Sequence, residues 1–216
     1  MFRVLMVLFG ILALGLASAK SKKEARGEAG VFDYYVLSLS WSPDYCASPA
    51  GANDSVQCSG TRQFDFVLHG LWPQYEKGYP QSCPSSIQDP GKALVDRMLD
   101  IMPSPKLVRH EWEKHGTCSG LKPVEYFAKA RTAFANWQIP PEYQSPKNAI
   151  TTNADEMRRK FLKVNPGVPR TSVAILCGGR FLREVRVCLD KNLKPRACGA
   201  DIRDTCRSEL IVRPIR

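Results

Sequence analysis

The sequence predicts an α+β protein in which several helices pack on a central, mainly antiparallel β-sheet and disulfides fasten the chain. Three observations lead to this fold class. Stretches with strand-like alternation lie near both ends of the chain, stretches with helical spacing lie between them, and eight cysteines follow a leader typical of exported proteins. With 44% hydrophobic and 24% charged residues among 216, the composition is that of a globular protein.

The first 19 residues, MFRVLMVLFGILALGLASA, predict a secretory signal peptide. They contain one arginine, an apolar run and the small residues Ala17-Ser18-Ala19. The apolar run is shorter than the roughly 20 residues that a membrane span needs. We therefore expect cleavage after Ala19, a secreted, extracellular or periplasmic location, and no membrane contact of the mature chain. Lysines directly after the run weakly favour an uncleaved anchor, and residues 20–30 predict a loose charged arm.

Two strands are expected next. Residues 33–41 (DYYVLSLSW) and 64–71 (FDFVLHGL) have the β-branched and aromatic content of strands, and Gly70 and Pro73 should end the second one. The segment 42–62 between them holds two cysteines, two prolines and two glycines, which predicts a loop.

Helical spacing then dominates until the pattern returns to strands. Pro103 should stop the first helix, and Thr152 or Asn153 should cap the last. Gly178-Gly179 should form the turn of a final hairpin. The expected helices are 92–101, 106–116, 124–137 and 154–164, and the expected hairpin strands are 172–177 (SVAILC) and 180–190 (RFLREVRVCLD).

The cysteines of an exported protein are most simply disulfides, because the compartment is oxidising. No pair has the C-x-x-C spacing of zinc ligands, so we expect bridges and no metal. Eight cysteines allow many pairings, and their spacing selects none of them. They are Cys46, Cys58, Cys83, Cys118, Cys177, Cys188, Cys198 and Cys206.

Three histidines mark the candidate site. His69, His110 and His115 are the only histidines of the chain. On a helix with about 100° per residue, His110, Glu111, Lys114 and His115 occupy one sector, whereas the two residues after Glu111 point away from it. An acid, a cation and two imidazoles on one face are costly to bury, so we expect them to line a site.

Two common enzyme classes fit this pattern poorly. His110-Glu111 opens like the H-E-x-x-H motif of zinc proteases, but the second histidine comes at i+5 and Lys114 takes the i+4 position, where its charge would repel a metal. A serine hydrolase would need a G-x-S-x-G elbow, which the sequence lacks. We expect no metal and no other cofactor.

Protonatable groups without a metal suit the cleavage of a phosphodiester. An RNA can be cut through its own 2′-OH if one group takes the proton of that hydroxyl, another protonates the departing 5′-oxygen, and positive charge stabilises the phosphorane. Two imidazoles can exchange the acid and base roles. The net charge of +10 is compatible with a polyanionic partner such as single-stranded RNA.

Two segments resemble the active-site segments of the ribonuclease T2 family. These are FVLHGLWPQ (66–74) and HEWEKHGTC (110–118), and LSLSWSPDYC (37–46) is similar to the first strand of that family. The resemblance extends from about residue 33 to the C-terminus. It implies a single ribonuclease domain over 31–216, an exported and metal-independent endoribonuclease with little base specificity, and products that pass through a 2′,3′-cyclic phosphate to 3′-phosphate ends.

The same resemblance implies a role for each site residue. His69 and His115 would be the acid–base pair, with His115 as base and His69 as acid in the first step. His110 would bind phosphate, and Glu111 with Lys114 would stabilise the phosphorane.

Substrate binding and the disulfides are also implied by the resemblance. Trp72 would stack on a base and Gln74 would lie in the same base pocket, although Gln74 and Leu107 differ from residues common in relatives, so base preference stays open. The chain would act as a monomer without an obligate protein partner. The implied bridges are Cys46–Cys58, Cys83–Cys118, Cys177–Cys206 and Cys188–Cys198.

Two other function classes stay open. One is a secreted RNA-binding or signalling protein on the same scaffold, which loss of either catalytic histidine would indicate; both are present. The other is a disulfide-stapled inhibitor or binding module, which leaves the sector of two histidines, an acid and a lysine unexplained.

Overall fold

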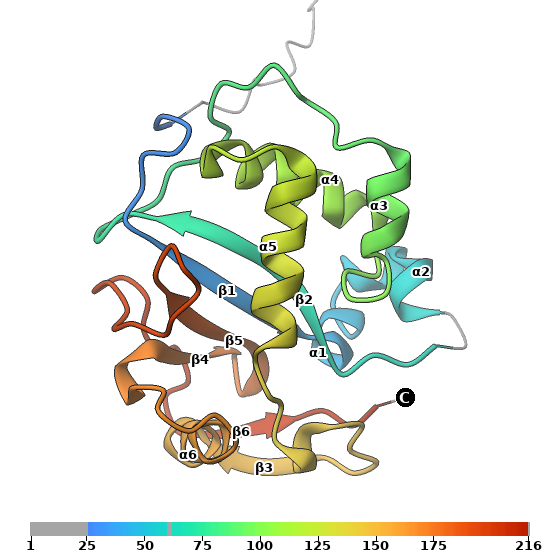
Figure 1. Cartoon of the computed structure of the whole chain (residues 1–216). Helices are drawn as coiled ribbons and strands as arrows, with labels where there is room; N and C mark the ends of the chain where they lie inside the picture. Colours follow the sequence, from blue (N-terminus) through green and yellow to red (C-terminus); the bar gives the residue numbers. More distant parts are fainter. Residues whose placement is uncertain (1–25, 60–61, 216) are drawn as a thin grey trace, which may run out of the picture.

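The computed structural model describes residues 26–59 and 62–215 (Figure 1). The expected signal peptide, 1–19, lies outside the described residues, as does most of the expected arm, 20–30. The strands are β1 (Tyr34–Trp41), β2 (Phe66–Gln74), β3 (Ile150–Asn153), β4 (Val173–Gly178), β5 (Phe181–Leu189) and β6 (Glu209–Val212). The α-helices are α1 (Ser42–Cys46), α2 (Ser55–Cys58), α3 (Lys92–Met98), α4 (Pro105–Lys114), α5 (Pro123–Ala135) and α6 (Ala154–Val164).

The strands form one sheet in the order β2-β1-β5-β6-β3, and β4 also pairs with β5. All these pairings are antiparallel except that of β5 with β6, which is parallel at Phe181 and Ile211. The prediction of an α+β fold with a mainly antiparallel sheet is therefore confirmed.

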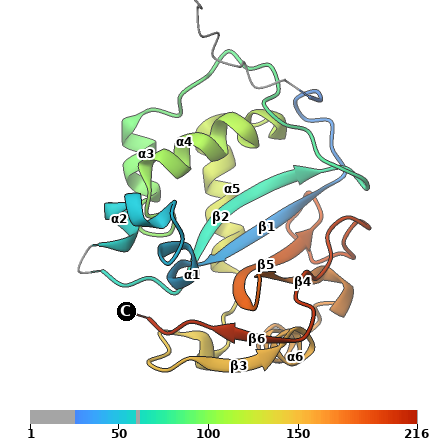
Figure 2. The ribbon, with the colours of Figure 1, turned by 180° about the vertical axis from the view of Figure 1, so that it is seen from behind.

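The hydrophobic core lies between β1, β2 and β5 and the helix α5, which crosses one face of the sheet (Figure 1). Leu37 and Leu39 of β1 pair with Leu71 and Leu68 of β2 on this face, and all four are fully buried. The phenol of Tyr126 in α5 donates a hydrogen bond to the carbonyl oxygen of Leu71 and so ties the helix to the strand. Figure 2, from behind, shows the strands in front of α5, so their second face remains for the site.

That second face carries polar side chains because strand residues alternate between faces. In register across the sheet, Gly70 of β2 lies opposite Ser38 of β1, which lies opposite Arg186 of β5. Glu184, two residues before Arg186 in β5, lies opposite Ser40 of β1. The helix α4 runs beside β2, an edge strand of the sheet. Sheet face and helix thus meet at the residues predicted to line a site.

Several element boundaries differ from the prediction. The second strand continues through Gly70 and Pro73 to Gln74, because β2 is an edge strand and the N–H that proline lacks is not needed for the sheet. The expected loop 42–62 contains the short helices α1 and α2. The hairpin turn is shifted by one residue, since Gly178 pairs with Phe181 and leaves Gly179 and Arg180 as the turn.

Other boundaries were well predicted. The helix α6 spans 154–164 as expected, and the Asn153 side chain caps it by accepting the N–H of Glu156. The strands β3 and β6 were not predicted. Each has four residues, too few for an alternation to stand out.

Four disulfides join the eight cysteines in the pairs that the resemblance implies. They are Cys46–Cys58, Cys83–Cys118, Cys177–Cys206 and Cys188–Cys198. The bridge at Cys118 fastens the chain just after α4, and the backbone N–H of Ser82 also donates to the carbonyl oxygen of Lys114. The end of α4 is thus held on the loop that follows β2.

Candidate active site

A β-bulge presents His69. Leu39 of β1 lies opposite Leu68 and its neighbour Ser38 lies opposite Gly70, so His69 is an extra residue of β2 without a partner in the register. A bulge of this kind bends the strand and re-aims the side chain at that position. The imidazole of His69 is about one third exposed, with 31% of its side-chain surface accessible.

Gly70 leaves room for a carboxylate from α4. A Cβ at this position would lie 2.0 Å from Oε2 of Glu111 and 2.4 Å from the indole nitrogen of Trp72. Only a residue without a side chain lets the Glu111 carboxylate reach the strand at this point. Gly70 of the segment 66–74 therefore leaves the space that Glu111 of the segment 110–118 occupies.

The helix α4 supplies the remaining candidates. Pro105 opens the helix, and the hydroxyl of Ser104 caps it by accepting the N–H of Leu107. The predicted sector is found: His110, Glu111, Lys114 and His115 all line one cavity. Trp112 points away, into the core, where its indole N–H donates to the carbonyl oxygen of Ile87.

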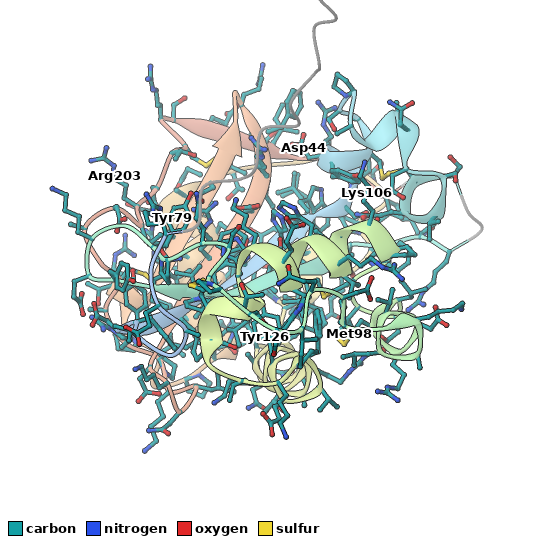
Figure 3. All side chains as sticks on the ribbon, turned by 90° about the horizontal axis from the view of Figure 1, so that it is seen from above. Asp44, Tyr79, Met98, Lys106, Tyr126 and Arg203 are labelled. Carbon is teal, nitrogen blue, oxygen red and sulfur yellow. A yellow bond between two sulfur atoms is a disulfide. The ribbon has the colours of Figure 1, made fainter. Side chains whose placement is uncertain are left out.

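Figure 3, seen from above, shows the two sides of α4. Tyr126 and Met98, which belong to the core, lie on one side of the helix, whereas Asp44 and Tyr79 lie on the other. The helix α4 thus lies between the core and the cavity, and its polar sector lines the cavity.

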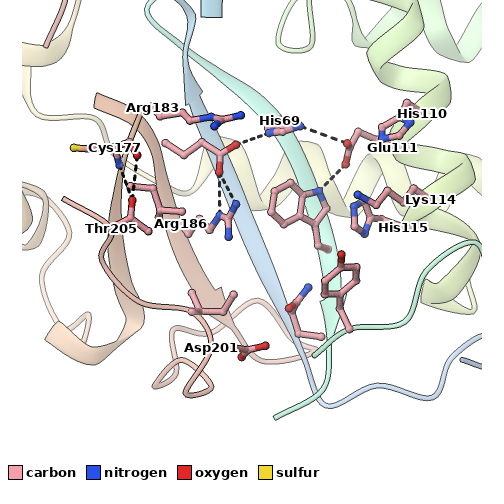
Figure 4. Close-up of a pocket in the computed structure, with 16 residues that line it drawn as sticks. His69, His110, Glu111, Lys114, His115, Cys177, Arg183, Arg186, Asp201 and Thr205 are labelled. Carbon is pink, nitrogen blue, oxygen red and sulfur yellow. Dashed lines mark hydrogen bonds and ion pairs between the residues drawn. The ribbon is translucent and has the colours of Figure 1, made fainter. Parts of the chain in front are cut away.

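Five side chains, one of which is His69, form a closed ring of contacts (Figure 4). The indole N–H of Trp72 donates to Glu111 Oε2 at 2.6 Å, and Glu111 Oε1 lies 3.7 Å from His69 Nε2. His69 Nδ1 lies 2.7 Å from Glu184 Oε1, and Glu184 Oε2 accepts two hydrogen bonds from Arg186, at 3.0 and 2.8 Å. The guanidinium of Arg186 closes the ring by lying 4.9 Å from the centre of the Trp72 ring.

His115 has a different environment. Its ring stacks on Trp72 with the centroids 5.1 Å apart and an angle of 24° between the planes. The residue is only 4% exposed, and its Nδ1 is buried without a hydrogen-bond partner among the residues that the structure describes. Burial, together with the charges of Lys114 and His69, holds the pKa of His115 well below its ordinary value.

The pKa of His69 moves in the opposite direction. Burial lowers it, but the hydrogen bond to Glu184 and the charges of Glu111 and Glu184 outweigh this, so the pKa is raised. Burial raises the pKa of Glu184, yet His69 and Arg186 outweigh it and lower the value to about 2. For Glu111, burial dominates and raises the pKa to about 7. One imidazole thus favours the protonated form and the other the neutral form.

Two cavities meet at His69. The larger, of about 550 Å³, is lined by the α4 sector, Trp72 and Tyr79. The smaller, of about 360 Å³, lies between α1, α2 and β5 and contains Leu107. His69, Arg183 and Glu184 line both cavities. An extended polymer could therefore pass across His69 with one unit on each side.

The base-pocket residues lie in the larger cavity, but deeply. Trp72 is 9% exposed and carries the contacts with His115 and Arg186 described above, while Gln74 is 2% exposed and its amide donates to the carbonyl oxygen of Pro73. Stacking of a base on Trp72 stays a prediction, as does the role of Gln74. Tyr79, half-buried beside His115 at a centroid distance of 6.1 Å, offers a more open ring.

Sequence reasoning missed Tyr79, Glu184 and Arg186. Glu184 and Arg186 stand two residues apart in a strand that is otherwise apolar except for Arg183, which puts both on one face. An acid and an arginine at that spacing in a mostly apolar strand were the available signal. Within residues 26–59 and 62–215, no group of three histidine, cysteine, aspartate or glutamate side chains could hold a metal ion. In the same part of the chain, no helix is both long and apolar enough to cross a membrane.

Comparisons with known proteins agree with the resemblance seen in the two segments. Residues 32–198 match the model of the ribonuclease T2 family. A ribonuclease of Aeromonas hydrophila is 38% identical over 98% of this chain and 92% of its own length. A probable ribonuclease of Haemophilus influenzae is 32% identical over 77% of this chain and 61% of its own. Among solved structures, ribonuclease MC1 from bitter gourd seeds has a TM-score of 0.65 at 25% identity, covering 83% of this chain and 99% of its own.

Proposed function

The chain belongs to the ribonuclease T2 family, and we propose that it is an exported endoribonuclease that cleaves single-stranded RNA by transphosphorylation through the 2′-OH. The observation that carries this mechanism is the pair His69 and His115, whose environments shift their pKa values in opposite directions within one cavity. Groups whose pKa values are separated in this way are suited to act as acid and base at the same pH.

In the first step, neutral His115 takes the proton of the 2′-OH while the 2′-oxygen bonds to phosphorus. The bond from phosphorus to the 5′-oxygen breaks, and protonated His69 gives its Nε2 proton to that oxygen. The product is a 2′,3′-cyclic phosphate and a free 5′-OH. In the second step the roles reverse: His69 takes a proton from water, the water oxygen attacks phosphorus, and His115 protonates the departing 2′-oxygen to leave a 3′-phosphate.

The charge of the phosphorane is balanced from α4. Lys114 and His110 line the cavity on the side of His115, where they can bind the phosphate oxygens. Glu111, with a pKa of about 7, is largely a neutral acid under weakly acidic conditions. In that form it does not repel the phosphate and can donate a hydrogen bond to it, as a buried carboxylic acid can in an oxyanion hole.

The two cavities suggest where the substrate lies. The nucleoside that carries the reacting 2′-OH must be near His115, hence in the larger cavity, and the leaving nucleoside must be near His69, hence in the smaller one. The half-buried ring of Tyr79 supports little base specificity, because every base has a π-face that can stack. A base would stack on Trp72 only if His115 or Arg186 moved off its ring. Export, by the expected signal peptide, and action as a monomer complete the proposal.

Digestion of homopolymeric RNAs with EDTA present tests the reaction. We expect cleavage of all four polymers, 2′,3′-cyclic phosphate ends that convert slowly to 3′-phosphate, and no cleavage of a 2′-O-methyl analogue. Nuclear magnetic resonance of phosphorus identifies the ends. Products with 5′-phosphate, or loss of activity on chelation, would overturn the mechanism.

A further inference from the structure

We propose that Glu184 of β5 is a positioning residue for the general acid: it accepts the Nδ1–H of His69 and so directs the Nε2 proton toward the leaving 5′-oxygen. The inference rests on the proposed function and adds to it a residue outside the two active-site segments. Its basis is the 2.7 Å contact between Glu184 Oε1 and His69 Nδ1.

The contact defines which nitrogen carries the proton. An ionised carboxylate only accepts hydrogen bonds, so the nitrogen that faces it must bear a hydrogen. When His69 is neutral, that hydrogen is on Nδ1, and Nε2 is free to receive a proton. Nε2 is the atom that faces Glu111 and the larger cavity, where the phosphate is bound in our proposal (Figure 4).

Arg186 keeps Glu184 ionised and in place. Its Nε and Nη2 both donate to Glu184 Oε2, which leaves Oε1 for the imidazole. Glu184 is 5% exposed, so few other orientations of the carboxylate are open to it. The charge-assisted fork of an arginine is among the more rigid contacts that a carboxylate can make.

The bulge makes this pairing possible. Glu184 lies opposite Ser40 of β1, and β1 separates β5 from β2. The extra residue in β2 re-aims His69 across β1, toward β5. Nδ1 of His69 therefore contacts Glu184 of the sheet, whereas Nε2 faces the larger cavity.

Other charged groups also act on His69, and a test has to separate them. Glu111 faces it from α4 and raises its pKa, whereas Arg186 of β5 lowers it. His115 and Lys114 lie at the end of α4, Arg183 lines both cavities beside it, and Asp44 of α1 lines the smaller one. None of these groups is hydrogen-bonded to Nδ1 of His69; Glu184 is.

Glu184→Gln is the direct test. His69 and Arg186 contact different oxygens of the Glu184 carboxylate, and glutamine has an NH₂ in place of one of them. An NH₂ that faces Nδ1 would move the imidazole proton to Nε2 in the neutral ring. We expect a pKa of His69 lower by about one pH unit or more, because an opposite charge in contact is lost. The alkaline limb of the kcat profile should move down by the same amount, and kcat should fall about ten- to a hundredfold with KM nearly unchanged.

Two further variants make the result specific. Glu209→Gln removes the same charge from β6, where Glu209 is exposed and pairs with Arg180, and it should change neither the pH profile nor kcat. Glu184→Asp keeps the charge on a shorter side chain and should restore part of the alkaline limb. A purely structural role of Glu184 would lower stability without moving the pH profile.

The pKa itself is measured without substrate, by following the three imidazole signals in magnetic resonance, with His69→Phe to assign one of them. If Glu184→Gln does not fold, the nitrogen shifts of wild-type His69 report the tautomer directly, and a proton on Nε2 in the neutral ring overturns the inference. If His69→Phe is inactive while Glu184→Gln keeps the wild-type profile, the inference fails and the proposed function stands. If His69→Phe keeps wild-type activity, the proposed function itself fails.

Discussion

Replacing Glu111 by glutamine should stabilise the protein at neutral pH while lowering its activity. Glu111 is 1% exposed, and burial raises its pKa from 4.5 to about 7. A carboxyl whose pKa is raised in the folded state is neutral in both states below the unfolded pKa, where it does not destabilise the protein. As the pH rises from the unfolded pKa to the folded pKa, it ionises first in the unfolded state, and the free energy of unfolding falls. The loss for Glu111 therefore occurs between about pH 4.5 and pH 7.

The expected size of the loss follows from this pKa. A rise of the pKa from 4.5 to about 7 lowers the free energy of unfolding by about 3 kcal/mol at pH 8, since a change of one pKa unit corresponds to about 1.4 kcal/mol. The value of about 7 already includes the favourable charge of His69. Glutamine has the same shape, its carbonyl oxygen can still accept the indole N–H of Trp72, and it has no charge to bury. Glu111→Gln should thus raise the free energy of unfolding by about 3 kcal/mol at pH 8 and by little at pH 4.5.

Urea unfolding without reductant, at several pH values between 4.5 and 8, measures the difference between the two proteins. Glu113→Gln, on the exposed side of the same helix, is the matched control, because there is no burial cost for it to relieve. The rate of RNA cleavage by Glu111→Gln should fall, though by less than on replacement of His69 or His115 by phenylalanine. A stability difference that does not depend on pH, or a variant less stable than wild type at pH 8, would refute the reasoning.

Four further substitutions give distinct outcomes. Gly70→Ala places a Cβ where the Glu111 carboxylate lies, so it should lower the free energy of unfolding by about 1–3 kcal/mol and kcat/KM at least about tenfold. Urea unfolding and RNA cleavage measure the two effects, and wild-type activity would show that the carboxylate can move. His69→Phe and His115→Phe should each slow single-turnover cleavage about 10²–10⁴-fold. The double variant should be little slower than the slower single variant, and the affinity for a 2′-O-methyl RNA should be unchanged in all three. Lys114→Ala should lower kcat more than it lowers RNA affinity, because its charge matters most when the phosphorane forms; equal losses would make it a binding residue only.

The sequence predicted the part of the site that depends on helix geometry. The spacing of His110, Glu111, Lys114 and His115 places them in one sector on any α-helix, and the structure has them in one cavity. The two active-site segments came from the resemblance to the family. Their contact through Gly70 could not be predicted, since it depends on how α4 lies against β2.

The sheet's contribution to the site was less predictable. A bulge is a difference in register between two strands, so the sequence of β2 alone does not show that His69 is the extra residue. Glu184 and Arg186 were hidden in a strand whose other residues are mostly apolar. Their importance comes from β5 and β2 lying on either side of β1, which is a property of the sheet order rather than of either strand.

The bridge Cys83–Cys118 has a consequence for limited proteolysis. Residues 84–91 are mostly exposed, and a cut there would put His69 and His115 on separate polypeptides. Of the four disulfides, only Cys83–Cys118 would join the two pieces, because the other three close loops within one piece or the other. The nicked protein would keep α4 against β2 at the high effective concentration of a tethered partner. Under oxidising conditions such a cut would leave a two-chain enzyme, and only reduction would let the halves of the site separate.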